Sequence, residues 1–92
     1  MKAKLICYDL SHLSQIKKVE VKRALFGYIE YSNNSKYKYQ RRGILEDIPH
    51  YKLTKAVVIV SMRDEKKVTK ILNKFRAKYL LFDIEVKKSL LA

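Results

Sequence analysis

The residues with the clearest chemical potential lie between positions 36 and 42, where cations and tyrosines alternate. In order, they are Lys36, Tyr37, Lys38, Tyr39, Gln40, Arg41 and Arg42. A β-strand points successive side chains to opposite faces, so this segment would be basic on its even-numbered face and mainly aromatic on the other. Lysine and arginine bind phosphate oxygens, and tyrosine rings can stack on unpaired bases. The pattern indicates a nucleic-acid contact, which Lys52 and Lys55 would support.

A purely structural interpretation of the same strand stays open. The tyrosines could pair with Tyr28 or Tyr31 across a hairpin or pack on the core, and the lysines could keep an exposed strand edge from aggregating. For the cations we favour phosphate binding over simple solvation. For Tyr37 and Tyr39 we favour packing over base stacking.

The charge balance of the whole chain also points to a polyanionic partner. Twenty-one Lys or Arg and nine Asp or Glu give a net charge of +12 on 92 residues. No acidic residue occurs in 31–45 or in 66–82. A third basic group comprises Lys17, Lys18, Lys22 and Arg23. A chain this short leaves little room for a deep pocket, which argues against a large cofactor enzyme.

Candidate catalytic residues are few. Asp9 follows the apolar run 5–8 and would therefore end a strand, where its carboxylate could cap the next segment or, in a homodimer, bind Mg²⁺ together with its twofold mate. We favour the cap. His12 and His50 have no visible partner and are expected to have loop or hydrogen-bonded structural roles, and a single Cys7 allows neither a disulfide nor a zinc site. We expect no cofactor, with Mg²⁺ only in the dimeric alternative.

The most clearly predicted element is a helix after residue 64, because apolar residues recur there at helical spacing. Its stripe consists of Val68, Ile71, Leu72 and Phe75. Ser61 or Asp64 would cap its start, and its lysines would form a solvated outer face. The β-branched run 56–60 predicts a central strand before this helix, and the alternation in 80–86 predicts a strand after it.

The N-terminal half is more ambiguous after a predicted strand at 3–8. Residues 11–26 fit a helix that ends at Gly27, but residues 19–31 also fit the period of a long strand. We favour the helix, whose apolar side would consist of Leu13, Ile16, Val19 and Phe26.

A hairpin is predicted next, with strands at 28–31 and 36–39 joined by the turn residues 32–35. Together the elements predict a single α+β domain over residues 1–92. Its order would be that of a ferredoxin-like βαββαβ sandwich, in which an antiparallel sheet carries both helices on one face and the basic β-hairpin protrudes.

The start of the chain predicts a cytoplasmic protein. The uninterrupted apolar run before Asp9 has only four residues, 5–8, which is too short for a signal peptide or a membrane span. Abundant lysine and isoleucine, with only two glycines, hint at a thermophilic source.

The segment Leu5-Ile6-Cys7-Tyr8-Asp9-Leu10-Ser11 resembles the first-strand signature of the small ferredoxin-like CRISPR-associated proteins that form the dimeric core of the spacer-acquisition complex. Gly27 and the pair Tyr31-Ser32 are similar to further features of that family. The resemblance implies a homodimer and, in members with nuclease activity, a metal-binding role for Asp9. It covers about the first third of the chain, and the sequence departs from the family pattern after Ser32.

The leading hypothesis is a non-catalytic module that binds the backbone of RNA or DNA. No recognition helix with base-reading side chains is apparent, so we expect weak sequence selectivity. Its contacts would come from the residues of 36–42, with Lys52 and Lys55. One alternative is a metal-dependent nuclease or CRISPR adaptation-complex subunit with Asp9 paired across a dimer. Another is a protein-binding regulator of viral or plasmid origin.

Overall fold

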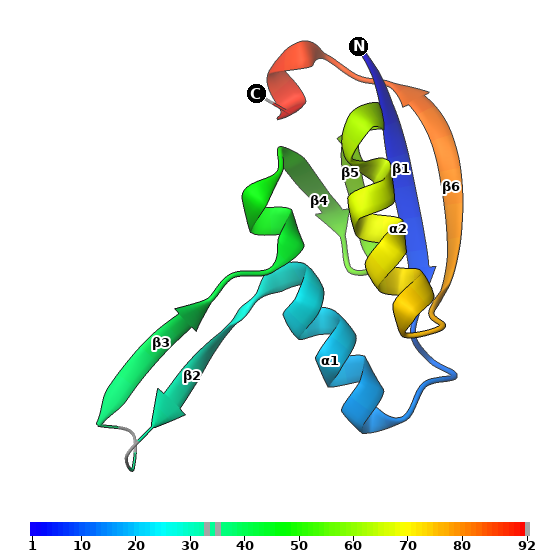
Figure 1. The fold of residues 1–92 in the computed structure, drawn as a ribbon. Helices are drawn as coiled ribbons and strands as arrows, with labels where there is room; N and C mark the ends of the chain where they lie inside the picture. Colours follow the sequence, from blue (N-terminus) through cyan, green and yellow to red (C-terminus); the bar gives the residue numbers. More distant parts are fainter. Residues whose placement is uncertain (33, 35, 92) are drawn as a thin grey trace.

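The computed structural model describes residues 1–32, 34 and 36–91, so positions 33 and 35 of the predicted turn lie outside the described residues. Within the described part, the architecture is α+β, with a four-stranded sheet, a separate two-stranded sheet and two α-helices (Figure 1).

The four-stranded sheet is antiparallel throughout. Its strands are β1 (Lys2–Asp9), β4 (His50–Thr54), β5 (Val57–Ser61) and β6 (Lys78–Glu85), in the spatial order β4-β5-β1-β6. In the register, Leu5 of β1 lies between Ile59 of β5 and Phe82 of β6. The prediction of a central strand near 56–60 is confirmed, because Val58, Ile59 and Val60 are buried in the middle of this sheet.

Helix α1 (Gln15–Phe26) resolves the ambiguity of the N-terminal half in favour of the helix. The Ser14 hydroxyl accepts a hydrogen bond from the Lys17 backbone N–H, and the chain leaves the helix at Gly27, where φ is +80°. The predicted buried stripe is partly wrong. Ile16 is 73% exposed, and the helix instead buries Val21 and Leu25, four residues apart.

Helix α2 (Glu65–Lys74) confirms the other predicted helix. Val68 and Leu72 are fully buried, and Ile71 and Phe75 pack at the edge of the core. Asp64 occupies the N-cap position, but its carboxylate makes no cap hydrogen bond to the helix backbone. That part of the capping prediction is wrong, because the carboxylate accepts from the Ser61 hydroxyl and the Lys67 ammonium instead.

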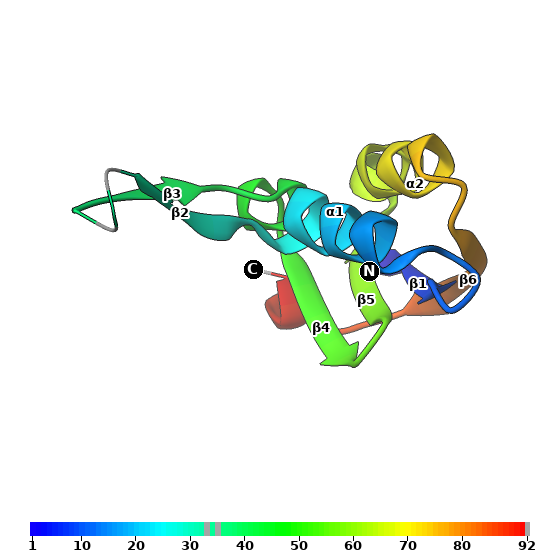
Figure 2. The same cartoon turned by 90° about the horizontal axis from the view of Figure 1, so that it is seen from below.

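Both helices cover the same face of the four-stranded sheet (Figure 2). The main core lies between these helices and the sheet. It contains Ile6, Tyr8, Val21, Leu25, Leu45, Val58, Val60, Val68 and Leu72. Leu45 comes from the short 3₁₀ helix η1 (Ile44–Asp47). On the opposite face of the sheet, the C-terminal 3₁₀ helix η3 (Lys88–Leu91) covers only one end, where Leu91 packs with Ala3 and Ile59.

The predicted hairpin is present as β2 (Tyr28–Ser32) and β3 (Tyr37–Arg41), which pair antiparallel and extend away from the rest of the molecule (Figures 1 and 2). Every residue of β3 is exposed. The root of the hairpin holds both glycines of the chain, Gly27 and Gly43, with their backbones in close approach. This contact is possible because neither residue has a Cβ.

Neither helix in the described part of the chain has the length and apolarity needed to cross a bilayer.

Candidate nucleic-acid interface

An open groove of about 790 Å³ lies between α1 and the β4–β5 connection. Its cations are Lys18, Lys22, Arg23, Lys52 and Lys55, which we call the groove cations. Tyr8, Phe26 and Ala56 contribute to its apolar lining. Such a surface offers both charge and shape to an anionic ligand.

Helix and sheet geometry explain why these cations meet. Lys18 and Lys22 lie four residues apart on α1, beside the face that buries Val21 and Leu25. Lys52 is paired with Val58 in the β4–β5 ladder, so both side chains leave the sheet on the face that α1 covers. The fold therefore joins two basic segments that are far apart in the sequence.

Two of the groove cations are held in place by aromatic rings. The Arg23 guanidinium lies 4.5 Å from the centre of the Tyr28 ring, and the Lys52 ammonium lies 4.6 Å from the centre of the Phe26 ring. Cation–π contact leaves the positive charge uncompensated, so it can orient these groups without blocking a bound anion.

None of the groove cations forms an ion pair with any residue that the structure describes. Asp9 is the carboxylate in the groove lining. It accepts a hydrogen bond from the Ser11 backbone N–H at 2.9 Å, and this bond lowers the pKa of the Asp9 carboxyl. Asp9 is thus ionised at neutral pH, but one carboxylate leaves the groove strongly positive.

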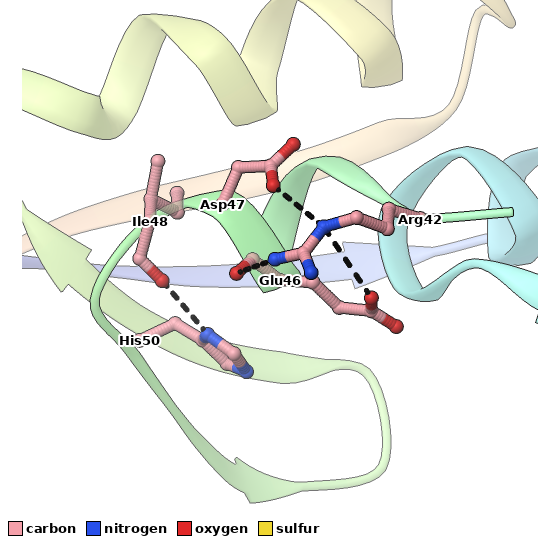
Figure 3. Close-up of polar contacts among 5 residues, drawn as sticks. All are labelled: Arg42, Glu46, Asp47, Ile48 and His50. Carbon is pink, nitrogen blue, oxygen red and sulfur yellow. Dashed lines mark hydrogen bonds and ion pairs between the residues drawn. The ribbon is translucent and has the colours of Figure 1, made fainter. Parts of the chain in front are cut away.

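The cations of the hairpin do not form the single surface expected from the sequence. Arg41 pairs with Glu30 across the hairpin, with 2.7 Å between Nε and Oε2. Arg42 pairs with Asp47 of η1 at 2.9 Å and also donates to the Glu46 carbonyl oxygen (Figure 3). Both arginines are therefore neutralised locally, and Arg42 fastens the end of the hairpin to η1.

Lys36 and Lys38 differ from these arginines. Both are exposed, and neither forms an ion pair with the described residues. Lys38 extends over the ring of Tyr31, its cross-strand neighbour, at 5.9 Å from the ring centre. Of the four hairpin cations, these two are the ones still available to phosphate.

The prediction that Tyr37 and Tyr39 pair with Tyr28 or Tyr31 across the hairpin, or pack on the core, is wrong. They lie opposite Ser32 and Glu30 in the register, not opposite Tyr28 or Tyr31. They remain 49% and 47% exposed, respectively, so they do not pack on the core. Their rings are accessible to a ligand.

The remaining candidates make backbone contacts. Asp9 bonds to the Ser11 N–H, as the cap interpretation predicted. His12 Nε2 lies 2.9 Å from the Arg76 carbonyl oxygen, and His50 Nδ1 lies 3.1 Å from that of Ile48 (Figure 3). In the described residues, no three His, Cys, Asp or Glu side chains are arranged to hold a metal ion.

No protein-family model matches the chain, and neither a curated protein nor a solved structure shows significant similarity to it. The resemblance of residues 5–11 to the spacer-acquisition proteins therefore stays a prediction.

The sequence shows the basic group at 17–23 and the pair Lys52 and Lys55, but it does not show that these residues lie side by side. The available signal was the spacing of Lys18 and Lys22, which predicts one helix face. The lysines of α2 do not line the groove, consistent with a solvated outer face for that helix.

Proposed function

We propose that this protein binds the phosphate backbone of RNA or DNA with weak sequence selectivity. The observation that carries the proposal is the groove, where cations from α1, β4 and the β4–β5 connection converge without ion-pair partners among the described residues. Lys36 and Lys38 on the hairpin are two further exposed cations that form no ion pair with the described residues.

A long polyanion fits this arrangement better than a small anion. The groove is open, and its cations come from separate elements, so they can contact successive phosphates. Contacts of this kind position a nucleic acid without reading its sequence. Release of condensed counterions would drive the binding, which should therefore weaken steeply with salt.

The strand order supports a ferredoxin-like assignment of the fold, which we include in this proposal. Without β2 and β3, the elements run β1, α1, β4, β5, α2, β6, and the sheet order is β4-β5-β1-β6. We infer a ferredoxin-like sandwich in which the β2–β3 hairpin is inserted between α1 and β4. The insertion places the hairpin directly after α1, the helix that supplies three of the groove cations.

The test is a salt titration with the triple variant Lys18→Gln/Lys22→Gln/Lys55→Gln. This variant leaves Arg23 and Lys52, which contact aromatic rings, in place. We expect affinity for a labelled polynucleotide at low salt to fall about tenfold. The slope of log affinity against log salt concentration should become shallower by about 2, because each lost phosphate contact removes about 0.7 to 0.9 from that slope. Filter binding or fluorescence anisotropy measures both.

The matched control is Lys66→Gln/Lys70→Gln/Lys74→Gln on α2, which removes the same charge from residues outside the groove. Equal losses in the two triple variants would overturn the groove as the site, and no retention of polynucleotide by the unaltered protein at low salt would overturn the function. Magnesium-dependent cleavage that Asp9→Asn abolishes would instead support the nuclease alternative.

A homodimer is also proposed, through the sheet face opposite the helices. This open face carries Leu5, Cys7, Tyr51, Leu80 and Phe82. Leu80 and Phe82 are 62% and 50% exposed. On a chain with net charge +12, two copies can approach closely only where like charges are absent, and the centre of this face is uncharged. An apolar face is its own complement, as a twofold interface requires.

The dimer proposal predicts that Leu80→Ser/Phe82→Ser weakens self-association about 10- to 100-fold, because each exposed apolar anchor contributes on the order of 1 kcal/mol or more. Analytical ultracentrifugation over a concentration series measures the change. Ile16→Ser is the control, since Ile16 is 73% exposed on α1, away from the open face. A monomeric unaltered protein at the highest concentration would rule this interface out.

A further inference from the structure

The antiparallel register sorts the hairpin side chains onto two faces, since directly opposite residues share a face. Tyr39 shares its face with Glu30, and Tyr37 shares it with Ser32. Tyr28 lies on that same face, two and four positions from Glu30 and Ser32. We call Tyr28, Tyr37 and Tyr39 the tyrosine face. The opposite face carries Ile29, Tyr31, Lys38 and Gln40.

The tyrosine face leads from the outer part of the hairpin to the groove. Tyr28, at the root, lies beneath the guanidinium of Arg23, which is itself a groove cation. Arg41, directly opposite Tyr28, extends toward the Tyr39 ring, 5.8 Å from its centre. Aromatic rings and guanidinium groups thus lie along one face of the hairpin from Tyr37 to the groove, and the Glu30 carboxylate on this face is paired with Arg41.

The spacing of the outer rings fits unpaired bases. Residues two apart in a strand are separated by about 7 Å. That distance is roughly twice the 3.4 Å rise per base along one strand of a duplex. Tyr37 and Tyr39 can therefore each hold one base of a splayed single strand, whereas the base faces of an intact duplex are already covered by their neighbours.

We propose that the tyrosine face stacks unpaired bases while the groove holds the adjoining phosphates, so that the preferred ligand is single-stranded RNA or DNA. This inference rests on the proposed function and selects one class of nucleic acid within it. Half-exposed rings on a protruding hairpin are otherwise unexplained, because neither Tyr37 nor Tyr39 packs on the core.

The test compares Tyr37→Leu/Tyr39→Leu with Tyr31→Leu. Tyr31 is the matched control, because it is 53% exposed on the opposite face of the same hairpin. The probes are a labelled single-stranded oligonucleotide, the same strand with abasic sites, and the corresponding duplex. We expect the double variant to bind the single strand at least about 20-fold more weakly, from two lost base stacks. The control should stay within about twofold of the unaltered protein.

The same experiment separates stacking from charge. The double variant should keep the salt slope of the unaltered protein, because no phosphate contact is removed, and should lose its preference for the base-bearing strand over the abasic one. Equal affinity of the unaltered protein for single strand and duplex would overturn the inference. So would equal losses in Tyr31→Leu and the double variant. Either result would leave the proposed function standing if the groove variant still weakened binding, whereas no binding of any probe would overturn both.

Discussion

Replacing Gly43 by alanine is expected to lower the free energy of unfolding by about 3 kcal/mol, an effect typical of severe steric overlap in a packed region. A Cβ at Gly43 would lie 2.3 Å from the Gly27 nitrogen and 2.4 Å from the Leu25 carbonyl oxygen. Both are backbone atoms at the end of α1, so no side-chain rotation can relieve the overlap. Either the helix end or the hairpin must move.

Such a movement would also disturb the proposed interface. Gly27 faces the backbone of β3, since a Cβ there would lie 2.4 Å from the Arg41 carbonyl oxygen. The two glycines therefore set the direction in which the hairpin leaves α1, and with it the contact between Tyr28 and Arg23. We expect Gly43→Ala to weaken binding of single strands as well as stability.

Urea denaturation followed by circular dichroism measures the stability change. Gln40→Ala is a suitable control, because Gln40 is exposed on β3 and an exposed substitution should change stability by no more than about 0.5 kcal/mol. A Gly43→Ala protein as stable as the unaltered one would show that the hairpin root is not close-packed.

Local sequence patterns were sufficient to predict most elements of the fold. The β-branched run of β5 and the regular stripe of α2 are strong periodic signals, and both elements occur where predicted. Helix α1 was harder, because its apolar residues do not fall on one stripe and Ile16 is exposed. Its ends, Ser14 and Gly27, carried the decisive information.

The candidate site depends on contacts between distant segments, which local patterns do not report. Lys22 and Lys52 are thirty positions apart and meet only because α1 packs over the sheet near β4. The neutralisation of Arg42 depends on η1, whose short turn returns Asp47 to the hairpin root (Figure 3). The exposure of Tyr37 and Tyr39 likewise follows from a hairpin that leaves the core, which alternation alone does not predict.

The second large effect is expected at Asp64, the most buried carboxylate among those in ion pairs. Its side chain is 4% exposed and accepts from the Ser61 hydroxyl at 2.8 Å and from the Lys67 ammonium at 3.2 Å. Burial raises the pKa of this carboxyl, but the bonds from Ser61 and Lys67 outweigh burial, so the pKa lies below its ordinary value of 3.8. Asp64 is therefore ionised in the folded protein at neutral pH.

Asp64→Asn should lower the free energy of unfolding at pH 7 by about 2–3 kcal/mol, because it leaves Ser61 and Lys67 without their charged acceptor. The carboxyl pKa is lower in the folded than in the unfolded chain, so Asp64 stabilises the fold above the unfolded value. That stabilisation is lost as pH falls through the folded pKa. The difference in the free energy of unfolding between the unaltered protein and Asp64→Asn should thus be constant near neutral pH. It should disappear below about pH 4.

Urea denaturation of both proteins at a series of pH values between neutral and about pH 2.5 measures this closing gap. The control is Asp83→Asn. The Asp83 side chain is 77% exposed, and its carboxylate is paired with Lys4. Solvent screens such a pair, so its loss should change stability by at most about 1 kcal/mol. A gap for Asp64→Asn that is no larger than that of the control, or that persists unchanged into strong acid, would show that the buried carboxylate does not anchor the start of α2.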